Sequence, residues 1–248
     1  MSDRYSRQIV IDEIGQEGQS KLNDAKVLVV GAGGLGSPAL MYLAGAGVGN
    51  IGIIDADCVS ESNLNRQVIH NVDNIGKNKA LSAGEGVLRL NDKINVTTYP
   101  IYLTKENAAD IISKYDFVLD CVDNFEGKFL INDECVRLKK PFCHAGVIRF
   151  NGQVLTYVPG RGPCYRCIFE DIPKEGDIPD NAKVGVIGAA TGIVGSVQAM
   201  EAIKYILGTG NLLTGKMFII DALTMDVRIA KFGKSNPECG ACGNMLWL

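Results

Sequence analysis

The sequence predicts a doubly wound α/β fold, in which a Rossmann-like parallel sheet continues into a C-terminal β-region. Three observations support this prediction. Short apolar runs alternate with helix-length segments through the first 150 residues, as they do in parallel sheets covered by helices. The first apolar run ends in a glycine-rich turn at residues 31–36, where such folds commonly begin a helix. Two further β-like runs, 216–221 and 226–232, lie near the end of the chain.

The elements of the first part follow in a regular order. A buried strand at 26–30 leads through glycines into a helix at 35–46, and the next strand, 50–55, ends on an acid. Three more helices are expected, at 78–90, at 104–114 with Thr104 as its N-cap, and after residue 120 as far as 139. The remaining strands are expected at 94–99, 116–120, 142–145 and 153–158.

The pattern changes after residue 158. Residues 159–183 are rich in glycine, proline and charge, and we expect an irregular segment of the kind that often carries function. A helix at 186–207 precedes the two final β runs. We divide the chain near residue 150 into the regions 1–150 and 151–248, and we expect both to belong to one continuous structural unit.

Composition and charge argue against several classes of protein. The chain has 248 residues, of which 46% are hydrophobic and 21% charged, as is typical of globular proteins. A net charge of -3 provides no basic field for nucleic acid, so we do not expect that partner. The polar start lacks the apolar core of a signal peptide, and the longest uncharged stretch, 184–200, is short for a membrane span and contains glycines. We expect a cytoplasmic protein without a membrane segment.

The glycine-rich turn predicts a nucleotide site. Its glycines lie between a predicted strand and a predicted helix, where they let the backbone approach phosphates at a helix N-terminus. Asp55 ends the next strand, where a carboxylate can accept the ribose hydroxyls. The absence of G-K-[ST] excludes a P-loop. Taken alone, the turn suits NAD, FAD and ATP equally, and it could also be a tight turn that binds nothing.

The residues that follow this acid favour a nucleoside triphosphate. In the segment SNLNRQ, residues 62–67, Arg66 offers a planar fork for phosphate oxygens, and Lys79 begins the next helix as a second cation. Asp123 and Asn124 follow a strand at the edge where open α/β sheets bind ligands, and a carboxylate there can hold Mg²⁺ against phosphates. Each of these residues taken singly could be a solvated surface residue, but their common place at strand ends is hard to explain in that way.

Four cysteines form two half-sites for a metal. Cys164 and Cys167 make one C-x-x-C pair, and Cys239 and Cys242 make a second pair in the tail. Four thiolates without an open coordination position suit structural zinc, and the lack of an export signal argues against disulfides. A redox dithiol and unligated thiols are the alternatives. We therefore expect the C-terminal β-region to carry a zinc site made of four cysteines.

Seven ordered motifs make the sequence resemble the bacterial E1-like adenylyltransferases, which activate the sulfur carriers of molybdopterin and thiamine synthesis. The resemblance covers essentially the whole chain. The motifs are R-Y-x-R-Q at 4–8, G-x-G-G-L-G at 31–36, D-x-D at 55–57, S-N-L-x-R-Q at 62–67, D-C-x-D-N at 120–124, C-Y-R-C at 164–167 and C-x-x-C at 239–242.

The resemblance implies an enzyme that uses ATP and Mg²⁺ to adenylate the C-terminal glycine of a small ubiquitin-like carrier ending in Gly-Gly. ATP binding then falls in 1–150, and carrier binding and zinc fall in 151–248. Catalytic roles are implied for Arg66, Lys79 and Asp123, and for Arg7, which would reach the phosphates of the partner protomer in a homodimer. Nucleotide contacts are implied for Gly34, Asp55, Asp57, Ser62, Asn63, Leu64, Asn65, Arg66, Gln67, Lys79, Asp123 and Asn124.

One feature of some family members is missing. They carry a cysteine before the last helix that bonds covalently to the activated carrier, and the corresponding position lies near Asn181, in a segment, 169–183, without cysteine. We therefore expect adenylation without a covalent bond to the carrier through that loop. A separate sulfur donor would then form the thiocarboxylate, because the sequence ends just after the last cysteines. The motifs do not indicate which carrier or pathway is served.

The other cysteines and the two histidines are assigned no chemistry. Cys58 follows the acidic turn and is expected to be exposed, whereas three cysteines lie in apolar runs as inert small hydrophobes: Cys121, Cys135 and Cys143. His70 and His144 have no serine or cysteine at a triad spacing, and we interpret both as structural.

Three other functions stay open. A relative that adenylates a carboxylate on a tRNA base or a peptide would share these motifs, although the acidic pI counts against tRNA. A nicotinamide-dependent oxidoreductase could use the same glycine turn, but it would bind NAD and ignore ATP. A non-catalytic scaffold stapled by zinc would have no need of Arg66, Lys79 and Asp123.

Overall fold

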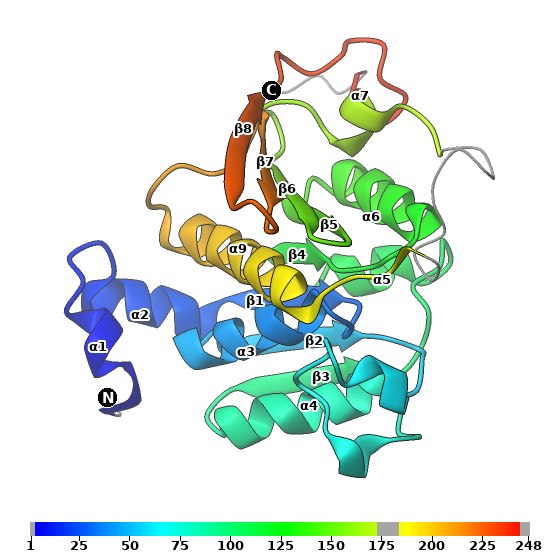
Figure 1. Ribbon diagram of the computed structural model, residues 1–248. Helices are drawn as coiled ribbons and strands as arrows, with labels where there is room; N and C mark the ends of the chain where they lie inside the picture. Colours follow the sequence, from blue (N-terminus) through cyan, green and yellow to red (C-terminus); the bar gives the residue numbers. More distant parts are fainter. Residues whose placement is uncertain (1–2, 173–183, 244–248) are drawn as a thin grey trace.

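A single mixed sheet organises the computed structural model, which describes residues 3–172 and 184–243 (Figure 1). The strand order across the sheet is β3-β2-β1-β4-β5-β6-β7-β8, parallel as far as β5 and antiparallel beyond it. The strands are β1 (Lys26–Val30), β2 (Asn50–Ile54), β3 (Asn95–Tyr99), β4 (Phe117–Asp120), β5 (Phe142–Ile148), β6 (Asn151–Tyr157), β7 (Lys216–Asp221) and β8 (Asp226–Lys231). The expected Rossmann-like sheet with a C-terminal β-region is confirmed.

Helices cover both faces of this sheet. One face carries α2 (Gly15–Asp24), α3 (Gly36–Ala46), α4 (Lys79–Leu90) and α9 (Gly188–Leu207). The other carries α5 (Ala108–Ile112), α6 (Phe125–Arg137) and α7 (Tyr165–Phe169). The described residues also form the short helices α1 (Ser6–Ile9), η1 (Asp3–Tyr5), η2 (Glu61–Asn63) and η3 (Val72–Asn74).

The central strand β1 shows why this layered arrangement forms. Val27 and Val29 pack into the core under α3, and Leu28 and Val30 pack on the opposite face with Phe129 of α6. A strand that is covered on both faces must be apolar at successive positions rather than at alternate ones. This requirement explains the unbroken run VLVV, which predicted the strand correctly.

The structure corrects several element boundaries. The helix expected at 104–114 is limited to α5, and Thr104 is not its N-cap. Asn107 instead accepts a hydrogen bond from the Thr104 backbone N–H at 2.9 Å, which holds the residues before α5 in a turn. The helices α1 and α2 were not predicted, and α7 lies in a stretch expected to be irregular. The division near residue 150 falls in the turn between β5 and β6 of the one sheet, and it stays a prediction.

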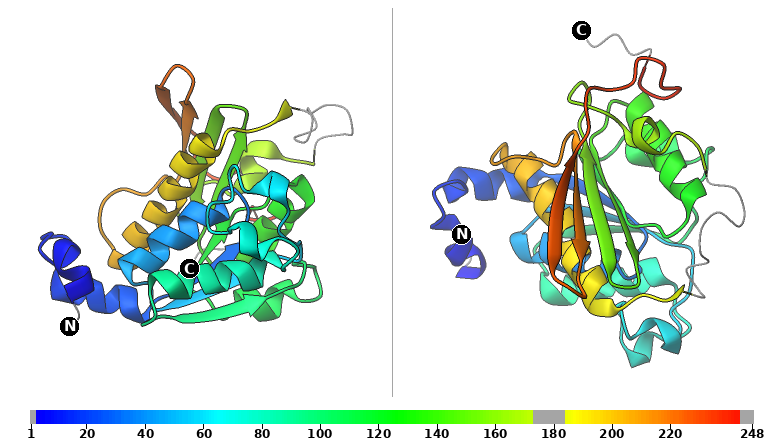
Figure 2. Two further views of the ribbon diagram at one scale, coloured as in Figure 1. Left: turned by 60° about the horizontal axis from the view of Figure 1, so that its bottom comes forward. Right: turned by 45° about the horizontal axis from the view of Figure 1, so that its top comes forward.

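After β8 the C-terminal tail runs to α7, as Figure 1 and the right view of Figure 2 show. This course of the chain brings together cysteines that are far apart in the sequence. Within the part of the chain that the structure describes, no helix combines the length and the apolar character needed to cross a membrane.

Candidate active site

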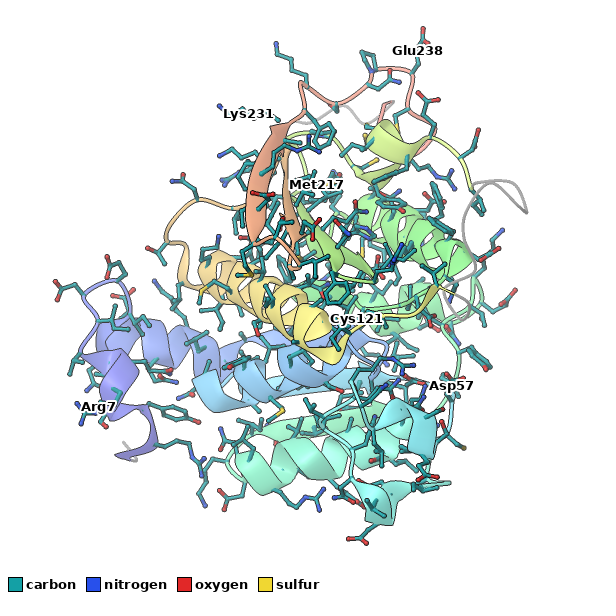
Figure 3. All side chains as sticks on the ribbon, viewed as in Figure 1. Arg7, Asp57, Cys121, Met217, Lys231 and Glu238 are labelled. Carbon is teal, nitrogen blue, oxygen red and sulfur yellow. The ribbon has the colours of Figure 1, made fainter. Side chains whose placement is uncertain are left out.

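A cavity of about 550 Å³ opens at the carboxyl ends of β1, β2 and β4. Its volume lies within the range of small-molecule pockets in proteins. The chain proceeds from β1 to β2 and β3 on one side and to β4 and β5 on the other, so the cavity lies at the switch point of the sheet. Figure 3 shows Asp57 and Cys121, which both line the cavity, and Arg7 on the opposite side of the molecule.

The glycine turn forms one wall of the cavity. Gly31 has a φ of +96°, which side chains disfavour, and a Cβ atom there would lie 2.8 Å from the Cys121 carbonyl oxygen. Both the backbone conformation and the lack of space therefore require glycine at this position. Gly34 also lines the cavity, and its contact to a nucleotide stays a prediction. The neighbouring Ala32 carbonyl is bonded at 2.9 Å by Nε2 of the buried His70, which confirms a structural role for that histidine.

Asp55 both faces the cavity and fixes the glycine turn. Its Oδ2 accepts the Ala32 backbone N–H at 2.8 Å, and its Oδ1 accepts the Asp57 N–H at 2.9 Å. Burial raises the pKa of Asp55 above its ordinary value, although these hydrogen bonds act against the shift. The carboxylate is therefore held in one orientation at the cavity wall, and its contact to a ribose stays a prediction.

Lys79 already has a partner in the cavity. Its ammonium group lies 2.9 Å from Asp57 Oδ2, and the Tyr102 hydroxyl donates to the other Asp57 oxygen at 3.1 Å. The hydrogen bond from Lys79 lowers the pKa of Asp57. Phosphates that approached Lys79 would therefore meet a cation whose position Asp57 has fixed. All three residues line the cavity, although Tyr102 was not predicted from the sequence.

Of the segment 62–67, only Arg66 and Gln67 line the cavity. Arg66 Nη1 donates to the Ser62 carbonyl and to Asn65 Oδ1, both at 3.0 Å, so these two residues orient the guanidinium. Asn63 Oδ1 accepts the Ser60 backbone N–H at 3.2 Å and caps the short η2 helix. Contacts to a nucleotide from Ser62, Asn63, Leu64 and Asn65 stay predictions.

The remaining three candidates, which are Asp123, Asn124 and Arg7, lie in two different parts of the molecule. Asp123 and Asn124 follow β4 and line the cavity. The side chain of Asn124 also caps α6, since its Oδ1 accepts the Gly127 N–H at 2.8 Å. Arg7 lies on α1 and does not line the cavity (Figure 3). The structure thus brings together Arg66, Lys79 and Asp123, and it leaves Arg7 apart from them.

A buried polar cluster that we did not predict lies beneath the cavity. It consists of Asp120, Lys128 and His144, of which Lys128 and His144 line the cavity, and we call it the cavity floor. The His144 Nδ1 lies 2.7 Å from Asp120 Oδ2, and the Lys128 ammonium lies 3.6 Å from Asp120 Oδ1. Lys128 also donates to the carbonyls of Val122 and Ala145 at 2.6 and 2.8 Å. Burial favours a raised pKa for Asp120, but the Lys128 charge and the bond from His144 lower it on balance.

A signal for this cluster was present in the sequence. Lys128 shares the buried stripe of α6 with Asn132, Cys135 and Val136, at helical spacings of four, seven and eight. A charge on an otherwise buried stripe indicates a buried partner. His144 is likewise a polar residue in the buried part of a strand.

The four predicted cysteines converge in space. Their sulfur atoms all lie within 4.8 Å of one another, with Cys164 at 3.6 Å from Cys239 and Cys167 at 3.3 Å from Cys242. Zinc–sulfur bonds of about 2.3 Å in a tetrahedron would place the sulfurs about 3.8 Å apart. The cluster therefore fits a four-coordinate zinc ion. The other cysteines agree with expectation, since Cys58 is exposed and Cys121, Cys135 and Cys143 are buried.

Comparison with known proteins identifies the family. Residues 5–241 match the ThiF family. The SAMP-activating enzyme E1 of Haloferax volcanii is 44% identical, over 97% of this chain and 88% of that protein. The sulfur carrier protein adenylyltransferase of Thermus thermophilus is 43% identical, over 98% and 91%.

Longer proteins and solved structures are also similar. The adenylyltransferase and sulfurtransferase MOCS3 of Culex quinquefasciatus is 44% identical over 97% of this chain. The match covers 55% of that protein, so this chain spans about half of its length. The crystal structure of E. coli MccB with ATP aligns with a TM-score of 0.84 and 27% identity, over 98% of this chain and 75% of that one. The chain therefore belongs to the ThiF family.

Proposed function

We propose that this protein uses ATP and Mg²⁺ to adenylate the C-terminal glycine carboxylate of a ubiquitin-like sulfur-carrier protein, with release of pyrophosphate. The observation that carries the proposal is the meeting of Gly34, Asp55, Arg66, Lys79 and Asp123 in one cavity at the sheet's switch point. The names of the relatives in Haloferax and Thermus support a carrier protein as the substrate.

The reaction needs positioning and charge rather than a protein nucleophile. A carboxylate oxygen of the carrier forms a bond to the α-phosphorus, and the bond from that phosphorus to the pyrophosphate oxygen breaks. Because both reactants are anions, Arg66 and Lys79 offset their repulsion and the charge on the leaving pyrophosphate. Asp123 is the proposed ligand of Mg²⁺, which would neutralise phosphate charge when bound. Asp55 and the glycine turn orient the nucleotide.

The lining of the cavity supports a tail without side chains as the second substrate. Besides the glycine turn it includes Phe125, Tyr165 and two glycines of the β5–β6 hairpin, Gly146 and Gly152. A Gly-Gly tail carries no side chains, and so its backbone can lie close to this hairpin with the carboxylate toward the nucleotide. A tRNA base or a peptide carboxylate is the second candidate substrate.

Four further assignments belong to the proposal. Arg7 does not line the cavity of its own chain, so its catalytic role requires a homodimer in which it reaches the partner's site. The cysteine cluster binds zinc and ties the tail to α7, and its thiolates suit the reducing cytoplasm. A separate protein supplies sulfur. The absence of a covalent carrier bond rests on the sequence, because the position near Asn181 lies outside the described residues.

ATP–pyrophosphate exchange with Mg²⁺, measured against a panel of carriers ending in Gly-Gly, tests the proposal. We expect exchange that depends on one carrier and that falls at least about a hundredfold in Asp123→Ala. The control Asp73→Ala removes an exposed acid outside the cavity and should retain full exchange. An enzyme that binds ATP but exchanges with no carrier would favour another carboxylate, and one that binds NAD in place of ATP would refute the proposal.

A further inference from the structure

His144 presents a bare acceptor at the floor of the cavity. Its side chain is 1% exposed and lines the cavity. The Nδ1 atom faces the Asp120 carboxylate, which can only accept a hydrogen bond while it is ionised, so Nδ1 carries the proton. The opposite ring nitrogen, Nε2, is then an acceptor. Burial and the charge of Lys128 lower the pKa of His144 to about 4, so the ring is neutral at physiological pH.

This acceptor has no protein partner within residues 3–172 and 184–243. Among the described residues no group donates a hydrogen bond to His144 Nε2, although the atom is buried. Its ring is also confined, because the ring of Tyr165 lies 4.4 Å away and that of Phe169 lies 6.4 Å away. An unpaired buried acceptor costs about 1–3 kcal/mol, and a bound molecule that supplies a donor removes this cost.

The chemistry of the reactants limits which group can supply that donor. The phosphates of ATP and the carboxylate of the carrier are acceptors, so neither can pair with Nε2. The ribose hydroxyls are expected at Asp55, on the far wall formed by the glycine turn. Peptide N–H groups of the carrier tail are donors. His144 lies on β5, three strands away from β2 and the Asp55 that follows it, and Tyr165, Gly146 and Lys128 line the cavity on the same side of the sheet's switch point as His144.

We infer that His144 Nε2 accepts a hydrogen bond from a peptide N–H in the C-terminal tail of the carrier, and thereby positions the tail carboxylate for adenylation. The inference deepens the proposed function and rests on it. Asp120 acts through His144, because it fixes the tautomer that leaves Nε2 free to accept. The site therefore selects a tail with an unsubstituted amide near its end.

The two histidines of the chain make a direct spectroscopic test possible. With ¹⁵N-labelled histidine, His144 should show a pyridine-like Nε2, whereas His70 should show the opposite tautomer because its Nε2 donates to the Ala32 carbonyl. We expect the active carrier, added with a non-hydrolysable ATP analogue, to shift the His144 Nε2 signal upfield and to leave His70 unchanged. An unshifted Nε2 signal in the saturated complex would overturn the inference.

A double-mutant cycle isolates the hydrogen bond. The variant is His144→Phe, and the matching substrate is a semisynthetic carrier in which an ester oxygen replaces one of the last two amide N–H groups in turn. Each single change should raise KM for the carrier by about three- to tenfold with little change in KM for ATP. The two changes combined should raise KM for the carrier no more than either change does alone. His144→Gln, which retains an acceptor, should recover part of the loss.

The outcomes separate the inference from the function on which it rests. If wild-type protein exchanges pyrophosphate with a carrier but both ester tails and His144→Phe act additively, the hydrogen bond does not exist and adenylation stands. If the wild-type protein exchanges pyrophosphate with no carrier, both the inferred hydrogen bond and the proposed adenylation of a carrier are refuted. If His144→Phe does not fold, the ester tails and the histidine spectrum on the wild type still decide the question.

Discussion

The buried pair of Lys128 and Asp120 allows a prediction of stability that the structure makes quantitative. In Lys128→Met, a side chain of similar length replaces an ammonium that is 8% exposed and that faces an Asp120 carboxylate only 1% exposed. The carboxylate then keeps its hydrogen bonds from His144 and from the Val122 backbone N–H but loses its cation, and the carbonyls of Val122 and Ala145 lose a donor. Breaking a buried ion pair from one side costs about 3–5 kcal/mol.

For a chain of this length, that loss should lower Tm by about 6–20 °C, as measured by the far-UV circular dichroism signal on heating. Lys21→Met is the matched control, because Lys21 pairs with Glu17 on an exposed helix face and should change Tm little. The double variant Lys128→Met with Asp120→Asn should recover more than half of the loss, since the uncompensated charge is gone.

The dependence on pH gives a second check with a definite sign. Lys128 lowers the pKa of Asp120 in the folded protein, so its removal raises that pKa. A carboxyl whose folded pKa is raised gains stability on protonation, and so the deficit of Lys128→Met should narrow as pH falls toward 4. A loss no larger than that of Lys21→Met, or a double variant no more stable than the single, would refute this account of the cavity floor.

Three further predictions concern other parts of the fold. Cys242→Ser should release zinc, seen with a chromogenic chelator, and lower Tm, whereas Cys58→Ser, at an exposed thiol, should do neither; retained zinc would contradict the metal assignment. Gly31→Ala should destabilise by more than about 1 kcal/mol in urea, whereas Gly45→Ala, on α3 with open space around it, should stabilise slightly; equal effects would contradict the role of the turn. Folding lowers the pKa values of His144 and His70, so these histidines take up protons at a higher pH in the unfolded chain than in the folded protein. The free energy of unfolding should therefore fall as pH drops from about 6.5 toward 4 and should stay level above about 6.5, in samples that retain their zinc. A flat profile between pH 4 and 6.5 would contradict the neutral histidines.

The sequence predicted the elements whose signal is local. β1 and the glycine turn could be predicted because a doubly covered strand must be apolar throughout and because Gly31 needs a positive φ. The four cysteines could be paired because their spacing carries the chemistry of the metal. The helix at 104–114 was predicted too long because the Asn107 side chain competes for the backbone of its first turn, an effect that periodicity does not show.

The cavity floor could not be assembled from the sequence, because its residues are far apart in the chain. Asp120 lies on β4, Lys128 on α6 and His144 on β5, and they meet Tyr165 of α7 only in the folded chain. A local motif also does not show which of its residues line the cavity and which only hold the neighbouring backbone in place. Arg66 and Asn63 belong to one motif, yet the first lines the cavity and the second caps a short helix. Arg7 shows the same limit, since its predicted role depends on a second chain.

Transfer of an oxygen isotope from the carrier to AMP tests whether the carrier carboxylate is adenylated. The carrier is prepared with ¹⁸O in its terminal carboxylate, incubated with ATP, Mg²⁺ and the enzyme, and the adenylate is then cleaved with a thiol. If the carboxylate attacks the α-phosphorus, one ¹⁸O atom should appear in AMP by mass spectrometry, because the bridging oxygen leaves with the phosphate. Label in inorganic phosphate, or AMP without label, would contradict carboxylate adenylation at this site.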